Sequence, residues 1–474
     1  MAEGMHNTDE GKKHTVNAAK HIWPFKQAKG VSPPSITDKL SMLSRDSLNI
    51  NTVRIYKVPE KHRNKNQEAY MPRLVSIGLI HYGESQLQNM EEQKLKYLHH
   101  FLHTFRVGLD NLTEYVLSQE KFVMDCYEET YRSNLSKKFK VQPHEVILLD
   151  GIFVVELFLK NHFPGMREKG DIIYENPWVS DDILHDLLLF ENQLPLRFLT
   201  TLYDTFVFKD AGRRLDYDII NPPSFNELAY KYFSNVGVTG KLLLPRDFRG
   251  ARHFIEFLSI LHMPTEQNWD ANSVRQQVGI MKSNFALCPT ATELRASGVR
   301  FQRGKGKHLL NVGFDSKKGV LRIPPLVVND STETFLRNLI AFEQSGYHSK
   351  FMTSYVILMD NLVNTHKDVD LLIKYNIIRN ELGSSEQVAD LFNNLYKEFV
   401  TDPREFYFME QCRQLNDYSR DWWHMIVSTV RKWFSILERD YFNTPWSIIS
   451  VIAAAVLLVL TVVQTVCSVL QVKH

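Results

Sequence analysis

The feature that most constrains what this chain can fold into is a long uncharged run near its C-terminus. No charged side chain lies between Asp440 and Lys473, and residues 448–470 read IISVIAAAVLLVLTVVQTVCSVL. At ~1.5 Å of rise per residue, a helix of this length covers about 34 Å, enough for a hydrocarbon core of ~30 Å. The run therefore predicts one C-terminal transmembrane helix over residues 446–470, with a short tail over 471–474.

The ends of this run carry residue types that are typical of a membrane interface. Pro445 suits a first helical turn, and Trp446 continues an aromatic belt that begins with Tyr441 and Phe442. Gln464 is the one costly polar side chain, which would face a partner helix or lie near the far interface. The alternative is a buried core helix, but apolar runs above ~18 residues without charge are rare in soluble cores. The residues assigned to the anchor are Pro445, Trp446, Ile448, Leu460, Gln464 and Leu470.

Basic residues on either side of the predicted helix indicate its orientation. Arg431, Lys432 and Arg439 precede it, whereas Lys473 alone follows it. Basic flanks stay on the cytoplasmic side, so we expect the large N-terminal part to face the cytosol. We expect the plasma membrane, rather than the endoplasmic reticulum, to hold the helix. The three glycosylation sequons, which begin at Asn111, Asn134 and Asn329, should then stay unmodified.

The N-terminal segment and the overall composition narrow the class of protein. Residues 1–51 are polar and contain no apolar stretch, which excludes a secretory signal peptide and predicts disorder. Of the 474 residues, 44% are apolar and 23% are charged, which are ordinary globular values. Lys plus Arg (56) nearly balances Asp plus Glu (54), so we expect no nucleic-acid partner.

The body between these ends, residues 52–440, shows mainly helical periodicity. Residues 143–162 are apolar nearly all round, which predicts a buried helix. Residues 180–207 predict a second helix that Pro195 must break or kink. Residues 296–328 alternate apolar and polar side chains between glycine-rich turns, which predicts a small antiparallel β meander. The expected fold is mainly α: a large helical cytosolic domain with this meander and one C-terminal transmembrane helix.

Two capping boxes are expected later in the chain. Asp330 with Glu333 would cap a helix over Thr334 to Glu343. Ser384 with Gln387 would cap the next amphipathic helix. The apolar face of that helix is predicted to hold Val388, Leu391, Phe392, Leu395 and Phe399.

Polar side chains inside apolar segments form a candidate structural or functional cluster. They are Asp150, Glu156, Glu191, Asn192 and Gln193. A carboxyl group in apolar surroundings can have a raised pKa and serve as an acid. The alternative is that residues 191–193 bind backbone groups left free at the Pro195 break, because buried polar groups must be paired. Asp150 and Glu156 are six residues apart, so they do not share a helix face.

Histidines and basic residues give weaker signals. His99 and His103 lie one helical turn apart, which suits a metal pair, and His100 lies between them. No third ligand is evident nearby, so we expect no metal and no cofactor. The predicted meander is basic, either as a solvated hairpin or as a patch that faces anionic lipid. Its basic residues are Arg300, Arg303, Lys305, Lys307, His308, Lys317, Lys318 and Arg322.

Common catalytic motifs are absent from the sequence. The stretch GKGKH over residues 304–308 lacks the Walker spacing and its Ser or Thr. The sequence has no G-x-S-x-G, H-E-x-x-H or C-x-x-C motif, and no protein-kinase set. No catalytic residue can therefore be assigned, and a protein without enzymatic activity is the favoured expectation.

Ordered blocks along the chain resemble one plant family. They include LLDGIFVVELFL, DLLLFENQLPLRFL, ATELRASGVRF, IPPLVVNDSTETFLRNLIAFEQ and SYVILMDNLVNTHKDVDLLIKYNII, within a span from about Arg54 to Leu470. These blocks are similar to the family known as domain of unknown function 247. The resemblance implies membrane association through the C-terminal helix and, for some grass members, a role in self-incompatibility. It attaches no catalytic activity or cofactor to the family as a whole.

Two functions are compatible with these observations. The first is a membrane-anchored protein-interaction module of unknown biochemical activity, in plant recognition or signalling, with a protein partner. The alternative is an enzyme of undescribed type whose site contains Asp150, Glu156 or Glu191. A cavity that collects these carboxylates would favour the enzyme. A filled core in which each carboxylate binds backbone would favour the interaction module.

Overall fold

The computed structural model of the chain describes residues 55–128, 131, 141–208, 222–234, 236, 250–263, 288–305, 308–345, 349–395, 405–420, 449, 453–454 and 456–465. The chain divides into two units, Met1–Thr52 and Val53–His474, and all described residues belong to the second. The segment 1–51, for which the sequence predicts disorder, lies outside the described residues.

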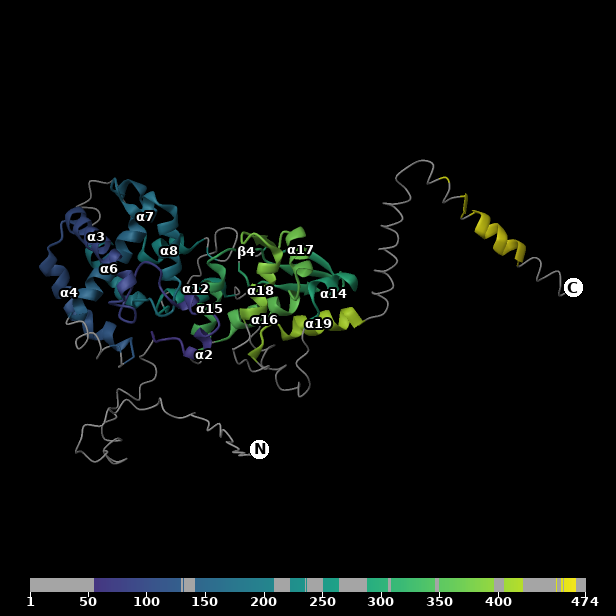
Figure 1. The fold of residues 1–474 in the computed structure, drawn as a ribbon, viewed down its shortest axis with the longest axis horizontal. Coiled ribbons are helices and arrows are strands. Elements are labelled where there is room, and N and C mark those ends of the chain that lie inside the picture. Colours follow the sequence, from purple (N-terminus) through teal and green to yellow (C-terminus); the bar gives the residue numbers. More distant parts are fainter. Residues whose placement is uncertain are drawn as a thin grey trace, which may run out of the picture. The chain divides into compact units, whose positions relative to one another are not determined.

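One buried helix, α6 (Pro143–His162), organises the first half of the described body (Figure 1). Its bounds are those that the sequence predicts, with Pro143 in the first turn, where its missing N–H is not needed. Helices α3 (Asn89–Phe105), α4 (Leu109–Asp125), α9 (Leu196–Tyr203) and α11 (Phe225–Phe233) pack against it. Helix α6 is apolar nearly all round, so it can be buried by neighbours on several of its faces.

An irregular turn separates α8 (Pro177–Leu187) from α9. Helix α8 begins at Pro177 rather than at the predicted Ser180, because proline is well suited to a first helical turn. The predicted break is present, since residues 188–195 are not helical and α9 starts directly after Pro195. One π-helical turn, η5 (Asp204–Phe208), follows α9.

A second group of helices makes up the rest of the described body (Figure 1). Its members are α12 (Phe254–His262), α14 (Ala291–Ala296), α15 (Thr332–Gln344), α16 (Phe351–Leu362), α17 (His366–Lys374), α18 (Ser385–Leu395) and α19 (Met409–Arg420). Helix α15 is central, because α12, α16 and α18 all pack on it. Helix α17 packs on both α14 and α18.

The N-terminal stretch, residues 55–88, contains little regular structure. It includes only the short helices α2 (Glu60–Arg63), η1 (Glu68–Tyr70) and η2 (Ser85–Leu87). Two further short helices, η4 (Pro164–Met166) and α7 (Ile172–Glu175), connect α6 to α8. Backbone N–H groups in the irregular stretch must find acceptors outside secondary structure when they are buried.

The described strands form two small sheets, which corrects the predicted antiparallel meander. Strand β1 (Arg300–Arg303) pairs in parallel with β3 (Val320–Ile323), and β2 (Gly313–Asp315) pairs antiparallel with β3. Strand β4 (Leu326–Val328) pairs in parallel with β5 (Ile378–Asn380). The expectation of strands within 296–328 is right, but the purely antiparallel order is wrong. Strand β4 instead finds its partner far along the chain, after α17.

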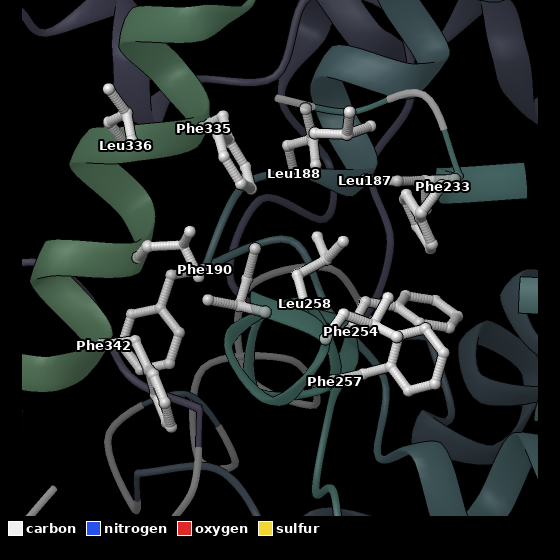
Figure 2. Close-up of a cluster of buried hydrophobic side chains, with 14 of the residues drawn as sticks. Leu187, Leu188, Phe190, Phe233, Phe254, Phe257, Leu258, Phe335, Leu336 and Phe342 are labelled. Carbon is white, nitrogen blue, oxygen red and sulfur yellow. The ribbon is translucent and has the colours of Figure 1, made fainter. Parts of the chain in front are cut away.

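Both groups of helices share one apolar core (Figure 2). Phe190, from the turn after α8, lies against Phe342 of α15, with ring centroids 6.0 Å apart. Phe254 of α12 packs against Phe233 of α11, with ring centroids 5.3 Å apart. Helix α12 therefore connects the two groups, because it contacts α11 through these rings and also packs on α15.

The predicted transmembrane helix falls partly outside the described residues. Of residues 446–470, the structure describes 449, 453–454 and 456–465, which are helical. Within the described part of the chain, no helix is both long and apolar enough to cross a membrane. The span therefore stays a prediction from the sequence.

Candidate functional site

The turn between α8 and α9 carries buried polar side chains that hold the N-terminal stretch. Asp186, near the end of α8, accepts hydrogen bonds from the backbone N–H groups of Arg73, Leu74 and Val75 at 2.7, 2.8 and 2.8 Å. These donors belong to irregular backbone, so a buried carboxylate supplies the acceptors that secondary structure would otherwise provide. One side chain thus fixes the path of three successive residues.

Asn192 binds the same stretch and the end of α8. Its side-chain oxygen accepts from the N–H of Ile77 at 2.6 Å. Its amide nitrogen donates to the carbonyls of Val75, at 2.9 Å, and Asp186, at 3.0 Å. Donor and acceptor are both used, so this fully buried amide is satisfied without solvent.

Gln193 binds the carbonyls that the helix break leaves free. Its amide nitrogen donates to the carbonyl oxygens of Leu187 and Leu189, both at 2.8 Å. Its side-chain oxygen accepts from the N–H of Phe254, at the start of α12, at 3.0 Å. Gln193 therefore completes the C-terminal end of α8 and ties it to the connecting helix.

Glu191 makes a buried charged contact with two basic side chains. Its carboxylate pairs with the guanidinium of Arg63 and lies 3.1 Å from Nε2 of His81, and it accepts from the N–H of Val58 at 2.6 Å. His81 also contacts Glu84 through Nδ1 at 2.8 Å. Burial lowers the pKa of His81, but the bonds to Glu191 and Glu84 outweigh burial and raise it above the ordinary value.

Asp150, in the middle of α6, holds the next part of the stretch. It accepts from the N–H of Gly78 at 2.8 Å and from the ammonium of Lys94 at 2.6 Å. Lys94, which is fully buried on α3, also donates to the carbonyl of Ser76 and the carboxylate of Glu91, at 2.7 and 2.6 Å. Burial raises the pKa of Asp150 to about 6, although Lys94 opposes the shift.

Glu156 lies in a separate contact. Its Oε2 is 3.0 Å from Nδ1 of His100, and no described residue hydrogen-bonds its Oε1. Burial raises the pKa of this carboxyl group, while His100 opposes the shift. The structure thus joins His100 of the predicted histidine cluster to Glu156, and leaves His99 and His103 exposed.

Four of the five predicted polar residues therefore bind the same N-terminal stretch or the α8–α9 turn, and Glu156 does not. We define the polar cluster as Asp150, Asp186, Glu191, Asn192 and Gln193. Asp186, Lys94 and Arg63 also take part in these contacts and are not among the residues predicted from the sequence. The sequence pattern could have indicated that Asp186 and Lys94 are buried. Asp186 lies one helical turn from Ile183 on the apolar face of α8, and Lys94 lies one turn from Tyr97 on the apolar face of α3.

Two pockets on the described surface are lined by residues outside the polar cluster. One pocket of about 370 Å³ is lined by Thr292, Arg295, Lys367, Asp370, Leu371 and Lys374. Another, of about 390 Å³, is lined by Gln93, Lys96, His99, Lys160, Glu168, Lys169, Gly170 and Asp171. Among the described residues, no group of three or more His, Cys, Asp or Glu side chains is placed to hold a metal ion. In the described structure, the side chains of the polar cluster pair with backbone groups and with buried basic side chains.

The chain is similar in sequence to known plant proteins over most of its length. The sequence profile of the family DUF247, described as plant protein of unknown function, matches residues 55–460. A UPF0481 protein of Arabidopsis thaliana is 28% identical over 437 residues, which cover 88% of this chain and 86% of the relative. A second UPF0481 protein of the same plant is 23% identical over an alignment of 501 residues, covering 87% and 89%. No solved structure matches the chain.

Proposed function

Since the chain belongs to the DUF247 family of plant proteins of unknown function, we propose that it is a membrane-anchored protein-interaction module. In this proposal the helical body faces the cytosol and binds another protein. The C-terminal helix holds it at the plasma membrane. The biological setting that we propose is plant recognition or signalling, and no catalytic step is assigned to the body.

The observation that carries the proposal is the burial of the candidate carboxylates. Asp150 is 1% exposed, and Glu156 and Glu191 are 0% exposed. A catalytic acid or base must come within hydrogen-bond reach of a substrate proton. Asp150 and Glu191 are instead occupied by Lys94, Arg63 and backbone N–H groups. This arrangement supports a structural role for both and leaves the outer surface for recognition.

The exposed apolar side chains near the C-terminus support the membrane part of the proposal. Leu457, Leu458 and Val459 are 65%, 67% and 61% exposed. They lie in the uncharged run between Asp440 and Lys473. Contiguous exposed apolar surface of this kind is typical of sites that contact lipid or another protein.

The test is proximity labelling in plant cells with the labelling enzyme fused to the N-terminus of the full chain. Residues 446–470 are exchanged, in a second version, for an unrelated anchor that reaches the same membrane. We expect the same labelled protein neighbours from both versions, because partner choice belongs to the body and the helix is a tether. Loss of those neighbours with unchanged localisation would contradict a passive tether.

A variant in the polar cluster separates the interaction module from the enzyme. Asp150→Asn retains the size of the side chain and one acceptor oxygen. We expect it to keep the labelled neighbours as long as thermal melting of the protein shows a folded body. A folded Asp150→Asn protein that keeps its neighbours but loses a biological readout would favour the enzyme instead.

A further inference from the structure

A shallow basic groove lies between α14 and α17. Three exposed cations line it, Arg295 from α14 and Lys367 and Lys374 from α17. None of the three makes an ion pair with any described residue, so their charges are available to a ligand. Asp370 is the acidic residue of the lining, and its carboxylate accepts from the Ser385 hydroxyl at 2.6 Å.

Asp368 links the two helices that form the groove. This buried carboxylate accepts from the N–H and hydroxyl of Thr292, at 2.9 and 2.8 Å, and from the N–H and hydroxyl of Thr365, at 2.9 and 3.0 Å. It therefore ties the start of α14 to the start of α17. Because the two helices are tied to each other, the backbone positions from which the three cations extend are set before a ligand binds.

Aromatic contacts link the groove to the basic sheet, and link that sheet to α19. The guanidinium of Arg295 lies 6.0 Å from the Tyr375 ring, which stacks on Phe301 of β1 at 6.0 Å. At the other edge of the sheet, Phe314 of β2 contacts Tyr418 of α19, with ring centroids 5.5 Å apart. Helix α19 ends at Arg420, and residues 421–445 then lead to the predicted span.

We propose that this groove binds the phosphate of an anionic phospholipid headgroup in the membrane that holds the C-terminal helix. The inference rests on the proposed membrane anchor. Arginine offers paired N–H donors to phosphate oxygens, and the two lysines add point charges. The adjoining sheet carries further exposed basic residues, Arg300 on β1 and Lys317 and Lys318 in the turn between β2 and β3. An anionic leaflet attracts such basic groups within about one Debye length.

The test is lysine footprinting of the full chain in vesicles. The protein is reconstituted into phosphatidylcholine alone, or into phosphatidylcholine with a minor fraction of phosphatidylserine, and treated with an amine-reactive reagent. We expect labelling of Lys367 and Lys374 to fall roughly fivefold in the anionic vesicles and to recover at high salt. Labelling of Lys121 on α4 and Lys231 on α11, which are exposed and lie outside the groove, should not change.

A charge reversal tests the groove itself. Arg295→Glu should remove most of the protection of Lys367 and Lys374, and the milder Arg295→Gln should remove part of it. Lys231→Glu is the matched control and should leave the protection intact. Equal labelling of Lys367 and Lys374 in neutral and anionic vesicles would overturn the proposal.

Further measurements distinguish a lipid phosphate from a free phosphate, and they test the proposed membrane anchor separately. Protection by inositol hexakisphosphate in detergent, without protection in anionic vesicles, would assign the groove to a free phosphate. Protection by an acidic peptide alone would assign it to a protein. Retention of the chain in neutral vesicles after alkaline extraction reports the anchor separately. If the chain is not retained, Arg295-dependent flotation with anionic vesicles is still expected, and its absence would overturn the groove.

Discussion

Glu191 is a fully buried carboxylate that contacts two basic side chains, Arg63 and His81. Replacing it with Ala leaves the Arg63 guanidinium buried without its partner and removes the acceptor for Val58. We predict that Glu191→Ala lowers the free energy of unfolding by at least about 3 kcal/mol, because an uncompensated buried charge is costly. Urea unfolding of the detergent-solubilised full chain measures this change.

The matched control for Glu191 is Glu84, which contacts the same histidine from a partly exposed position. Glu84→Ala should cost less than about 1 kcal/mol, since partly solvated ion pairs contribute little. Equal losses for the two variants would mean that the Arg63–Glu191 pair does not hold the N-terminal stretch.

Gly78 has two reasons to be glycine. Its φ is +81°, and an added Cβ would collide with the Tyr127 hydroxyl and the Gln193 carbonyl. Gly170 has φ +88° but open space around it. We predict that Gly170→Ala costs about 1 kcal/mol of stability, for the left-handed backbone alone. Gly78→Ala should cost about 2 kcal/mol more, for the added overpacking. Similar melting temperatures for the two variants would contradict this account.

At the residue scale, the sequence identified polar side chains but not all of their partners. Asn192 and Gln193 bind carbonyls freed at the break before Pro195, which local reasoning anticipates. Glu191 instead binds Val58 and Arg63, which are 133 and 128 positions away in the chain. No local pattern connects such distant residues, so their pairing requires the folded structure.

At the scale of elements, Glu343 links two helices. It belongs to α15 and accepts from the N–H groups of Met352 and Thr353, at the start of α16, both at 2.7 Å. Burial raises the pKa of Glu343 from 4.5 to about 7, although these hydrogen bonds oppose the shift. The folded protein therefore binds a proton here more tightly than the unfolded chain does.

The sign of the resulting pH dependence follows from linkage. Between about pH 4.5 and about pH 7, the folded state holds more protons at Glu343 than the unfolded state, so stability falls as pH rises. We predict a loss of about 3 kcal/mol from this group across that window. The Gln side chain of Glu343→Gln does not titrate. The free energy of unfolding of this variant, measured in urea, should therefore fall less steeply with pH across the window. Identical slopes for the two proteins would contradict the raised pKa.

The limits of sequence prediction differ between elements. Helix α6 was predicted to the residue, because a long apolar segment with proline in its first turn is a strong local signal. The box of Asp330 with Glu333 did not form, since α15 starts at Thr332 and Glu333 pairs with Arg337 instead. For the predicted box of Ser384 with Gln387, the Ser384 hydroxyl accepts from the N–H of Gln387 at 3.2 Å.

The strands were harder to predict than the helices because their pairing is not local. Strands β2, β4 and β5 each have three residues, too few for an alternating pattern to fix a partner. The parallel pairs β1–β3 and β4–β5 require crossovers that hairpin reasoning does not consider. Short apolar segments thus indicate that strands exist without indicating their order.

At the scale of the whole molecule, the sequence predicts the fold class, whereas the contacts between distant residues are seen only in the folded body. The body is mainly helical around one continuous core, as expected from the periodicity. Membrane attachment is instead a prediction from the composition at one end of the chain, where the uncharged run and its basic flank predict the topology. That prediction is the central claim on which the proposed function and the lipid groove both depend.

The most direct measurement of that claim is protease accessibility in sealed microsomes from plant cells that express the full chain. We predict that added protease digests the body and that the protein resists alkaline extraction before digestion. Asn111, which is exposed on α4, should carry no glycan if its sequon faces the cytosol as we propose. A body protected from protease, or a glycan on Asn111, would place the body in the lumen and contradict the account.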